Sequence, residues 1–206
     1  MSSEIKVSSV KAKDGTAGIS IANSSGNVSL SGTLSAGTIG SSVTGFTGVK
    51  EFDQWRYIAD ISSPTTDGVI STDSNWERFD NDSFSQIGTG MTVSSGVFTF
   101  ATTGIYLILA NVTYESNSAG VAHPRIDVEL TTDNANYNSR GRASCGQQSG
   151  QVGYFISASC AVPFKVSNTS THKVRFKTVN TSSAAKFSGS TDLNENSFTF
   201  IRVGDA

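Results

Sequence analysis

The chain has little charge and no long apolar segment. Only 16% of its 206 residues are Asp, Glu, Lys or Arg, and the formal net charge is −2 with both signs interspersed. A protein that neutralises nucleic-acid phosphates needs a basic face, so this composition argues against a nucleic-acid partner. No run of about 20 apolar residues occurs, and Met1-Ser2-Ser3-Glu4 does not open a basic and then apolar export signal. We expect no membrane contact, and a protein made in the cytoplasm that leaves a cell by lysis or inside an assembly.

Cysteine is also scarce, with only Cys145 and Cys160 present. Residues 151–165 alternate in polarity, which predicts that Cys160 is a small core residue of a strand. If residues 146–150 form a hairpin loop, Cys160 lies roughly 30 Å from that loop, at ~3.3 Å per residue. Bridged cysteines have Cα atoms within about 7 Å of each other. We therefore expect two free thiols, compatible with a reducing cytoplasm.

Residues that support catalysis are few. The two histidines, His123 and His172, lie in polar turn-like segments, and no Gly-x-Ser-x-Gly motif occurs, so a serine triad is not supported. Five acids that sugar cleavage would use cluster along the chain: Asp53, Asp60, Glu77, Asp80 and Asp82. We expect these acids at turns and strand ends, in solvent. The sequence predicts no enzyme and no cofactor.

Two segments gather oxygen donors that suit calcium. Asp80-Asn81-Asp82 opens like a calcium loop, and residues 192–196 are similarly rich in carboxylates and amides. Neither has the glycine at position six and the glutamate at position twelve that an EF-hand requires. No cysteine and histidine spacing indicates zinc. We interpret both segments as turns built by Asx hydrogen bonds, and we predict no metal site.

The chain is rich in serine, threonine and glycine and contains twelve phenylalanines, a composition typical of β-structure with many tight turns. Its most informative stretch begins at Ser95. Val97–Phe100 reads as a short aromatic strand, Thr102-Thr103-Gly104 breaks it, and Ile105–Val112 is almost continuously apolar, as in a strand covered on both faces. Since one sandwich covers only one side of a strand, we expect a second copy of the chain to cover the other.

Other segments repeat the strand pattern. Residues 126–130 alternate apolar residues inward with acids outward, and residues 174–179 alternate with basic residues outward. Trp55 and Trp76 both flank apolar strand positions, which favours core or intersubunit packing over stacking on a sugar. About eight to ten strands at this spacing, without a recurring helical pattern, predict an all-β sandwich or jelly roll.

Residues 1–48 differ from residues 49–206. No aromatic residue precedes Phe46, and glycine recurs throughout the first segment. Three short apolar pairs interrupt it, and these are the predicted docking residues: Ile5, Val7, Ile19, Ile21, Val28 and Leu30. A strand triplet with one apolar edge cannot bury itself, so we expect a β-arm that intertwines with other copies as a fibre shaft or lies against a larger partner. The alternative is a flexible Gly/Ser linker.

Several of these segments carry a family resemblance. Residues 95–109 and the closing segment Asn196–Val203 resemble the globular heads of the C1q and tumour-necrosis-factor group, and the likeness in strand order covers about residues 52–204. In Asp53-Gln54-Trp55-Arg56 and Trp76-Glu77-Arg78 the chain looks most like the C1q-type heads of bacteriophage appendage proteins. The resemblance implies a ten-strand jelly roll that assembles as a homotrimer.

Site residues follow from this resemblance and from the apolar strands. We predict that the three-fold core uses the central and closing strands, through Ile105, Leu107, Leu109, Phe198 and Phe200. By analogy with binding heads, loops at one end of the jelly roll present ligand-contacting residues: Arg140, Arg142, Gln147 and Gln148.

The sequence therefore predicts a non-enzymatic bacteriophage virion protein, a trimeric fibre or decoration appendage whose arm docks onto a capsid or tail protein. The alternative is a host-recognition lectin at a tail-fibre tip, gripping a surface glycan with loops at residues 140–150 and 119–124. A secreted C1q-like protein is less favoured because no signal peptide is visible.

Overall fold

The structure is a computed structural model, and it divides the chain into two compact units, Met1–Phe46 and Thr47–Ala206. It describes residues 9–11, 17–21, 28–30, 49–62, 67–79, 86–116, 123–146, 152–179 and 185–206. One turn of 3-10 helix, η1 (Asp73–Asn75), is the sole helix in these ranges, and every other regular element there is a strand. No helix in the described ranges has the length and apolar character that a membrane span needs. The predicted all-β class is confirmed.

The N-terminal unit contains a small antiparallel sheet in the order β1 (Ser9–Lys11), β2 (Ala17–Ile21), β3 (Val28–Leu30). Its register places Ile19 opposite Leu30, and Ile21 opposite Val28. The predicted strands at Ile19–Ile21 and Val28–Leu30 are therefore present and paired. The predicted docking residues Ile5 and Val7 lie outside the described residues.

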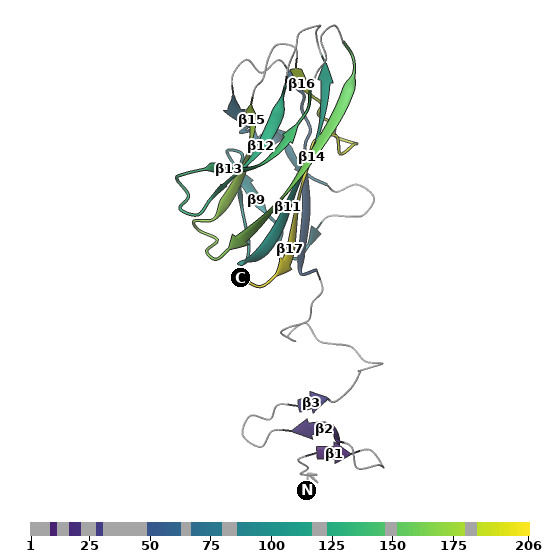
Figure 1. Ribbon diagram of the computed structural model, residues 1–206, viewed down its shortest axis with the longest axis vertical. Coiled ribbons are helices and arrows are strands. Elements are labelled where there is room, and N and C mark those ends of the chain that lie inside the picture. Colours follow the sequence, from purple (N-terminus) through teal and green to yellow (C-terminus); the bar gives the residue numbers. More distant parts are fainter. Residues whose placement is uncertain are drawn as a thin grey trace. The chain divides into compact units, whose positions relative to one another are not determined.

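Two antiparallel sheets form the C-terminal unit (Figure 1). The smaller sheet has the order β13 (Asn138–Ser144), β12 (Arg125–Thr131), β15 (Lys173–Val179), β10 (Val97–Thr99), β9 (Thr92–Ser94), and β6 (Gly68–Val69) also pairs with β15. The larger sheet has the order β5 (Ile61–Ser62), β16 (Ala185–Phe187), β11 (Gly104–Ser116), β17 (Ser197–Gly204), β4 (Glu51–Tyr57), β7 (Trp76–Arg78), with β14 (Phe155–Val166) on β11 and β8 (Gln86–Ile87) on β4.

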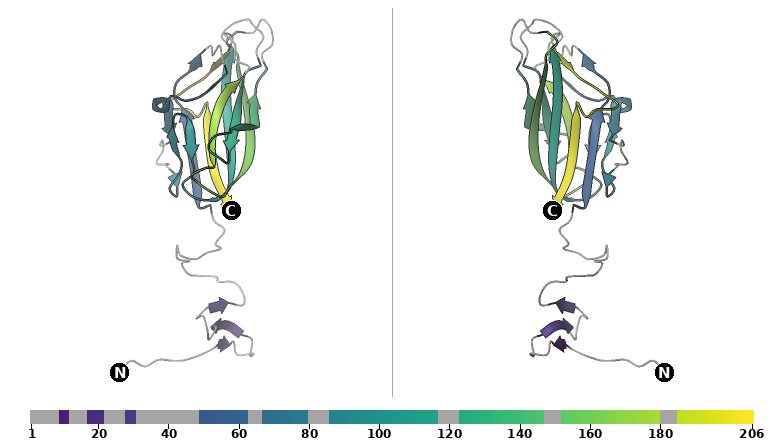
Figure 2. Two further views of the ribbon diagram at one scale, coloured as in Figure 1. Left: turned by 90° about the vertical axis from the view of Figure 1, so that its left-hand side faces the viewer. Right: turned by 90° about the vertical axis from the view of Figure 1, so that its right-hand side faces the viewer.

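Strands that are distant in the sequence lie side by side in the eight-stranded sheet. In the right-hand view of Figure 2, β14, β11, β17 and β4 follow one another as the green, teal, yellow and blue strands. The last strand of the chain thus lies between the first strand of the unit and its central strand, as in a jelly roll. Strands β11 and β14 pair along twelve positions, from Gly104 opposite Val166 to Glu115 opposite Phe155.

An aromatic core fills the space between the sheets. Trp76 is 6% exposed, and its ring centroid lies 4.9 Å from Phe98 and 5.0 Å from Phe198. Trp55 is also buried and meets Phe98 edge-on, at 5.6 Å. Such edge-to-face contacts add to the hydrophobic gain from burying large rings. Both tryptophans therefore pack in the core, as the sequence predicted.

The core also corrects the predicted three-fold interface. Phe198 and Phe200 are 0% and 1% exposed, and they pack against Phe176 and Phe98 of the same chain, with centroids 4.1 Å and 5.3 Å apart respectively. Successive side chains of a strand point to opposite faces. Because these two phenylalanines fill the protomer's own core, their side chains are not available to another copy.

Strand β11 was predicted to be apolar and covered on both faces. The structure covers one face only: Tyr106, Ile108 and Ala110 are at most 1% exposed, inside the core. Ile105 lies on the opposite face and is 38% exposed. The apolar run of the sequence is thus a core strand with a second apolar face that the described residues leave partly exposed.

The acids of β12 lie on the outward face that the alternation assigns to them, but they are buried. Asp127 is 3% exposed and binds the guanidinium of Arg125 at 2.9 Å, while Glu129 is 6% exposed and binds that of Arg175 at 2.6 Å. The acids do face away from the core, but arginines from β12 itself and from the neighbouring strand cover them. Burial of a carboxylate is tolerated when it is paired and hydrogen-bonded in this way.

The turn between β9 and β10 depends on Gly96. Its φ is +73°, and a Cβ there would lie 2.2 Å from the carbonyl oxygen of Ile70. We expect Gly96→Ala to lower the free energy of unfolding by about 1–3 kcal/mol, measured by urea denaturation. Gly153→Ala is the matched control, because Gly153 has a φ of +75° with nothing within 4 Å of the added Cβ. Equal losses in the two variants would contradict a steric role for Gly96.

Candidate functional site

An apolar row crosses the outer face of the eight-stranded sheet, on the side opposite the core. The strand registers place its five members opposite one another, from β8 through β4, β17 and β11 to β14: Ile87, Phe52, Ile201, Leu107 and Pro163. Ile87 is 46% exposed, Pro163 is exposed, and the other three are half-buried. This partly exposed apolar row is a candidate interaction surface.

Three of the predicted interface residues lie on this face. Leu107 belongs to the apolar row, and Ile105 and Leu109 are its neighbours on the same side of β11, because side chains alternate along a strand. The other members of the row were missed by sequence reasoning. The sequence held a signal for one of them. In the closing segment, alternation along Phe198-Thr199-Phe200-Ile201 places the two phenylalanines on one face of the strand and Ile201 on the other.

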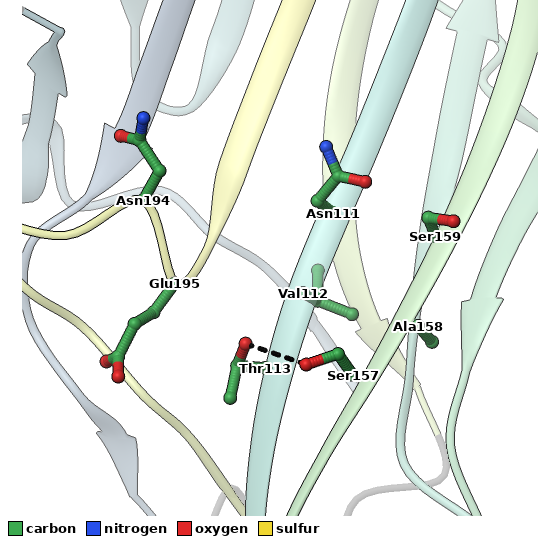
Figure 3. Close-up of a pocket in the computed structure, with 8 residues that line it drawn as sticks. All are labelled: Asn111, Val112, Thr113, Ser157, Ala158, Ser159, Asn194 and Glu195. Atoms are coloured by element: carbon green, nitrogen blue, oxygen red, sulfur yellow. Dashed lines mark hydrogen bonds between the residues drawn. The ribbon is translucent and has the colours of Figure 1, made fainter.

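A polar groove of about 300 Å³ lies farther along the same face, beyond the apolar row (Figure 3). Asn111 and Thr113 of β11 face Ser157 and Ser159 of β14 across it, and Asn194 and Glu195 line the opposite side. The hydroxyl oxygens of Thr113 and Ser157 are 3.2 Å apart. Amides, hydroxyls and one carboxylate give this groove hydrogen-bonding capacity but no nucleophile and base in contact.

Asp53 was predicted to be a solvated acid and is instead 1% exposed in the middle of β4. Its carboxylate accepts hydrogen bonds from Arg78 Nε at 2.8 Å, from Trp55 Nε1 at 2.9 Å and from the backbone N–H of Met91 at 2.6 Å. These donors come from β4, β7 and the segment before β9. Asp53 therefore ties one edge of the sheet together, and its oxygens are occupied by structural partners.

Two neighbouring acids are also held in structural pairs. Glu77 of β7 binds the Arg56 Nε at 2.9 Å, and Arg56 is only 1% exposed. Glu51 accepts hydrogen bonds from Tyr106 Oη at 2.6 Å and from Thr102 Oγ1 at 2.7 Å. Burial, reinforced by the hydrogen bond to Glu51, raises the pKa of Tyr106 well above its usual value. Tyr106 is thus a hydrogen-bond donor in the fold and not a base.

The thiols and imidazoles are placed for packing. Cys145 and Cys160 are free cysteines, and burial raises the pKa of both thiols, so both are held in the protonated, poorly nucleophilic form. The His172 ring stacks on Phe164 at 5.6 Å, with Nε2 3.2 Å from the Ser167 hydroxyl. Among the residues that the structure describes, no three His, Cys, Asp or Glu side chains gather to hold a metal ion.

The structure describes only one of the two segments that were interpreted as turns rich in oxygen donors. Asp80-Asn81-Asp82 lies outside the described residues. In residues 192–196, the backbone N–H groups of Asp192 and Leu193 both donate to the Ser190 hydroxyl, at 3.1 Å and 2.9 Å. Asn196 is buried and accepts the backbone N–H of Thr113 at 3.1 Å. This segment is therefore a turn held by side-chain to backbone hydrogen bonds.

The predicted ligand residues Arg140 and Arg142 lie on strand β13 and not in a loop, which corrects the sequence interpretation. Arg142 is exposed and lies 3.5 Å from Asp127 on the outer face of the six-stranded sheet. Arg140 instead lines a second groove, of about 410 Å³, between β13 and β14. Gln147 and Gln148 lie outside the described residues.

Comparison with known proteins finds likeness in fold but not in sequence. No protein-family model matches the chain, and no curated protein is similar to it in sequence. The structure of murine APRIL at pH 5.0 is 14% identical, with a TM-score of 0.54, and the match covers 74% of this chain and 98% of that one. The structure of Eiger TNF from S. frugiperda is 12% identical, with a TM-score of 0.52, and covers 75% and 93% respectively. The chain therefore contains a TNF-like jelly roll, as the resemblance predicted.

Proposed function

We propose that this protein, which contains a TNF-like jelly roll, is a non-enzymatic structural protein of a bacteriophage virion. Three copies pack the outer faces of their eight-stranded sheets around one axis, and residues 49–206 form the exposed head of an appendage. Residues 1–48 attach the head to a capsid or tail protein. Three linked heads bind a surface through high effective concentration, so the mechanism is avidity and not catalysis.

The observation that carries the proposal is the apolar row on the outer sheet face. A jelly-roll protomer needs one face of each sheet for its own core, and here the opposite face of the larger sheet remains apolar from Ile87 to Pro163. Burying this row would stabilise an assembly by about 25 cal/mol for each Å² of apolar area that is removed from water. The C1q and TNF resemblance implies that three copies provide the cover.

The virion context is supported by the two segments that resemble bacteriophage appendage heads. Residues 53–56 and 76–78 are far enough apart in sequence to be independent motifs, yet they pair in one place, with Trp55 opposite Arg78 and Arg56 opposite Glu77. The Asp53–Arg78 and Arg56–Glu77 ion pairs hold them together. The resembling residues thus form one local structure, which favours a shared structural motif over two chance matches.

The non-enzymatic character is supported by how reactive groups are used. Asp53, Glu51 and Glu77 accept hydrogen bonds from structural donors, Cys145 is buried and Cys160 is half-buried. Among the residues that line the polar groove, no hydroxyl is hydrogen-bonded to a carboxylate or an imidazole. In the groove between β13 and β14, the Thr131 hydroxyl donates to Asp133, but that carboxylate is held within its turn by Asn136. These residues maintain the fold, which suits a protein whose task is to persist and assemble.

Deleting residues 1–48 is expected to leave a folded, self-associating head that no longer joins particles. The two compact units of the chain make this separation physically reasonable. Incorporation is measured by complementing particles that lack the protein and assaying purified virions for the truncated chain. Full-length protein with Arg142→Gln is the control for general effects of mutation. A truncated head that co-purifies with virions would move the docking function out of the arm.

The second candidate function, recognition of a surface glycan, is favoured by a specific feature. Arg140, one of the predicted ligand residues, lines the groove between β13 and β14. The groove shares one residue with the apolar row, because Pro163 belongs to both.

A further inference from the structure

The groove of about 410 Å³ between β13 and β14 lies on the open side of the sandwich. Among the described strands, β13 pairs with β12 and β14 pairs with β11, so the groove runs between the edges of two sheets. Its volume falls in the range of about 300–1,000 Å³ that small-molecule sites occupy. The apolar side of the groove consists of Leu130, Val162, Pro163 and Phe164.

A β-bulge directs Arg140 into this groove. In the register of β12 and β13, Val128 lies opposite Gly141 and Glu129 lies opposite Ser139, which leaves Arg140 as the extra residue. Bulges re-aim side chains and are frequent beside binding sites. On either side of the bulge, Ser139 and Arg142 both reach Asp127 on the outer sheet face, so the bulge separates Arg140 from that charge cluster.

Gly141 brings the two strands together at this point. A Cβ at position 141 would lie 2.3 Å from Val162 Cγ2 and 3.2 Å from Cys160 Sγ. The glycine therefore lets the backbone of β13 approach the side chains of β14 closely. This close approach sets the apolar floor of the groove directly beside the bulged Arg140.

Arg140 is also the one arginine whose charge is not balanced within the described part of the chain. The sequence contains seven arginines, and the structure places the other six in ion pairs. Asp133 lines the same groove, but its carboxylate accepts hydrogen bonds from Thr131 Oγ1 at 2.8 Å and from the Asn136 backbone and side-chain N–H groups at 2.8 Å and 2.7 Å. Its oxygens shape the turn and do not pair with Arg140.

The chemistry of the groove selects one class of ligand. A guanidinium recognises a carboxylate through two parallel hydrogen bonds. The amide of Asn138 and the hydroxyl of Thr132 supply donors and acceptors at the rim, while the exposed Pro163 supplies an apolar surface. We propose that this groove binds a carboxylated sugar unit, with its carboxylate on Arg140, its hydroxyls on the rim and its C–H face on the apolar floor.

The test uses the full-length protein in its native assembly. Binding of an oligogalacturonate and of the neutral galacto-oligosaccharide of the same length is measured by isothermal titration calorimetry. We expect the acidic ligand to bind at least tenfold more tightly than the neutral one, and its affinity to fall as salt is raised. The variant Arg140→Gln should lose about tenfold or more in affinity for the acidic ligand and nothing for the neutral one.

Arg142→Gln is the matched control. Arg142 is an exposed arginine two positions along the same strand, but it faces Asp127 on the other surface, so we expect its variant to bind within twofold of the wild type. Arg140→Lys should give an intermediate affinity because it keeps the charge and loses the bidentate geometry.

Three results would overturn the proposal. The first is equal affinity for acidic and neutral ligands, and the second is no binding of either at millimolar concentration. The third is dissociation of the native assembly by Arg140→Gln in analytical ultracentrifugation, which would make the groove an intersubunit contact. Neither of the first two results bears on self-association, which Leu107→Asp tests, or on virion incorporation, which the deletion of residues 1–48 tests.

Discussion

Replacing Leu107 with aspartate is expected to abolish self-association and to leave the jelly-roll protomer folded. Leu107 is half-buried on the outer face of β11, opposite Ile201 on one side and Pro163 on the other. Its side chain is not part of the protomer core. In the proposed trimer the new carboxylate would be buried against an apolar surface without a partner, at a cost of about 3–5 kcal/mol per site. Sedimentation equilibrium at micromolar concentration should find wild-type trimers and variant monomers.

Two further variants separate assembly from folding. Leu193→Asp makes the same chemical change at a loop leucine that is 63% exposed and lies outside the apolar row, and it should leave the trimer intact. Phe200→Asp places the charge in the protomer's own core, where Phe200 is 1% exposed, and it should prevent folding. Intact trimers of Leu107→Asp, or a wild-type protein that sediments as a lone protomer, would contradict the proposed interface.

Replacing Asp53 with asparagine is expected to give the largest loss of stability that a single polar change causes in the head. The carboxylate is 1% exposed and accepts from Arg78, Trp55 and the Met91 backbone. An amide of the same size removes the charge opposite Arg78 and turns one acceptor into a donor that faces other donors. Breaking a buried pair in this way costs about 3–5 kcal/mol, measured as a lower urea midpoint at an unchanged m-value.

Asp60→Asn is the matched control for Asp53→Asn. Asp60 is also an ion-paired acid, but its side chain is 43% exposed and lies 3.2 Å from Lys186. Exposed pairs contribute about 0–1 kcal/mol because water screens them. Similar losses of unfolding free energy in the two variants would show that Asp53 stabilises the fold no more than a surface acid does, and would contradict its structural role.

The strands could be predicted because their signal is local. Residues 97–100, 174–179 and 196–203 all form strands at or within a few residues of the predicted bounds. Alternation with a period of two reports on the faces of a strand and needs no knowledge of its neighbours. The aromatic core residues Trp55 and Trp76 were placed by the same reasoning.

Which face of a strand meets the core could not be predicted so well. The closing strand has phenylalanines on one face and Ile201 on the other, and both faces are apolar. Only the pairing of β17 between β11 and β4 shows that Phe198 and Phe200 point inward, against Phe176 and Phe98. The predicted interface therefore loses Phe198 and Phe200, whose side chains fill the core, and stays a prediction for Ile105, Leu107 and Leu109.

The burial of charged side chains was harder still to predict from the sequence. Asp53 was expected in water and Glu129 on an outward face, yet each is buried beside an arginine, 25 and 46 residues away in the sequence. A carboxylate is buried only where a cation and hydrogen-bond donors meet it, and those partners arrive from other strands. Arg140 is the converse case, since a register shift between β12 and β13 sends it away from the acids that its neighbours contact.

The sequence by itself determined the secondary structure and class of this protein, because alternation, turn residues and composition act over a few residues. The tertiary structure alone decided which apolar face is inside, which acids are buried and where each arginine points. These depend on contacts between strands that are distant along the chain, and such contacts are set by sheet order and register. Sheet order and register therefore create both the apolar row and the Arg140 groove, on which the proposed functions of the molecule depend.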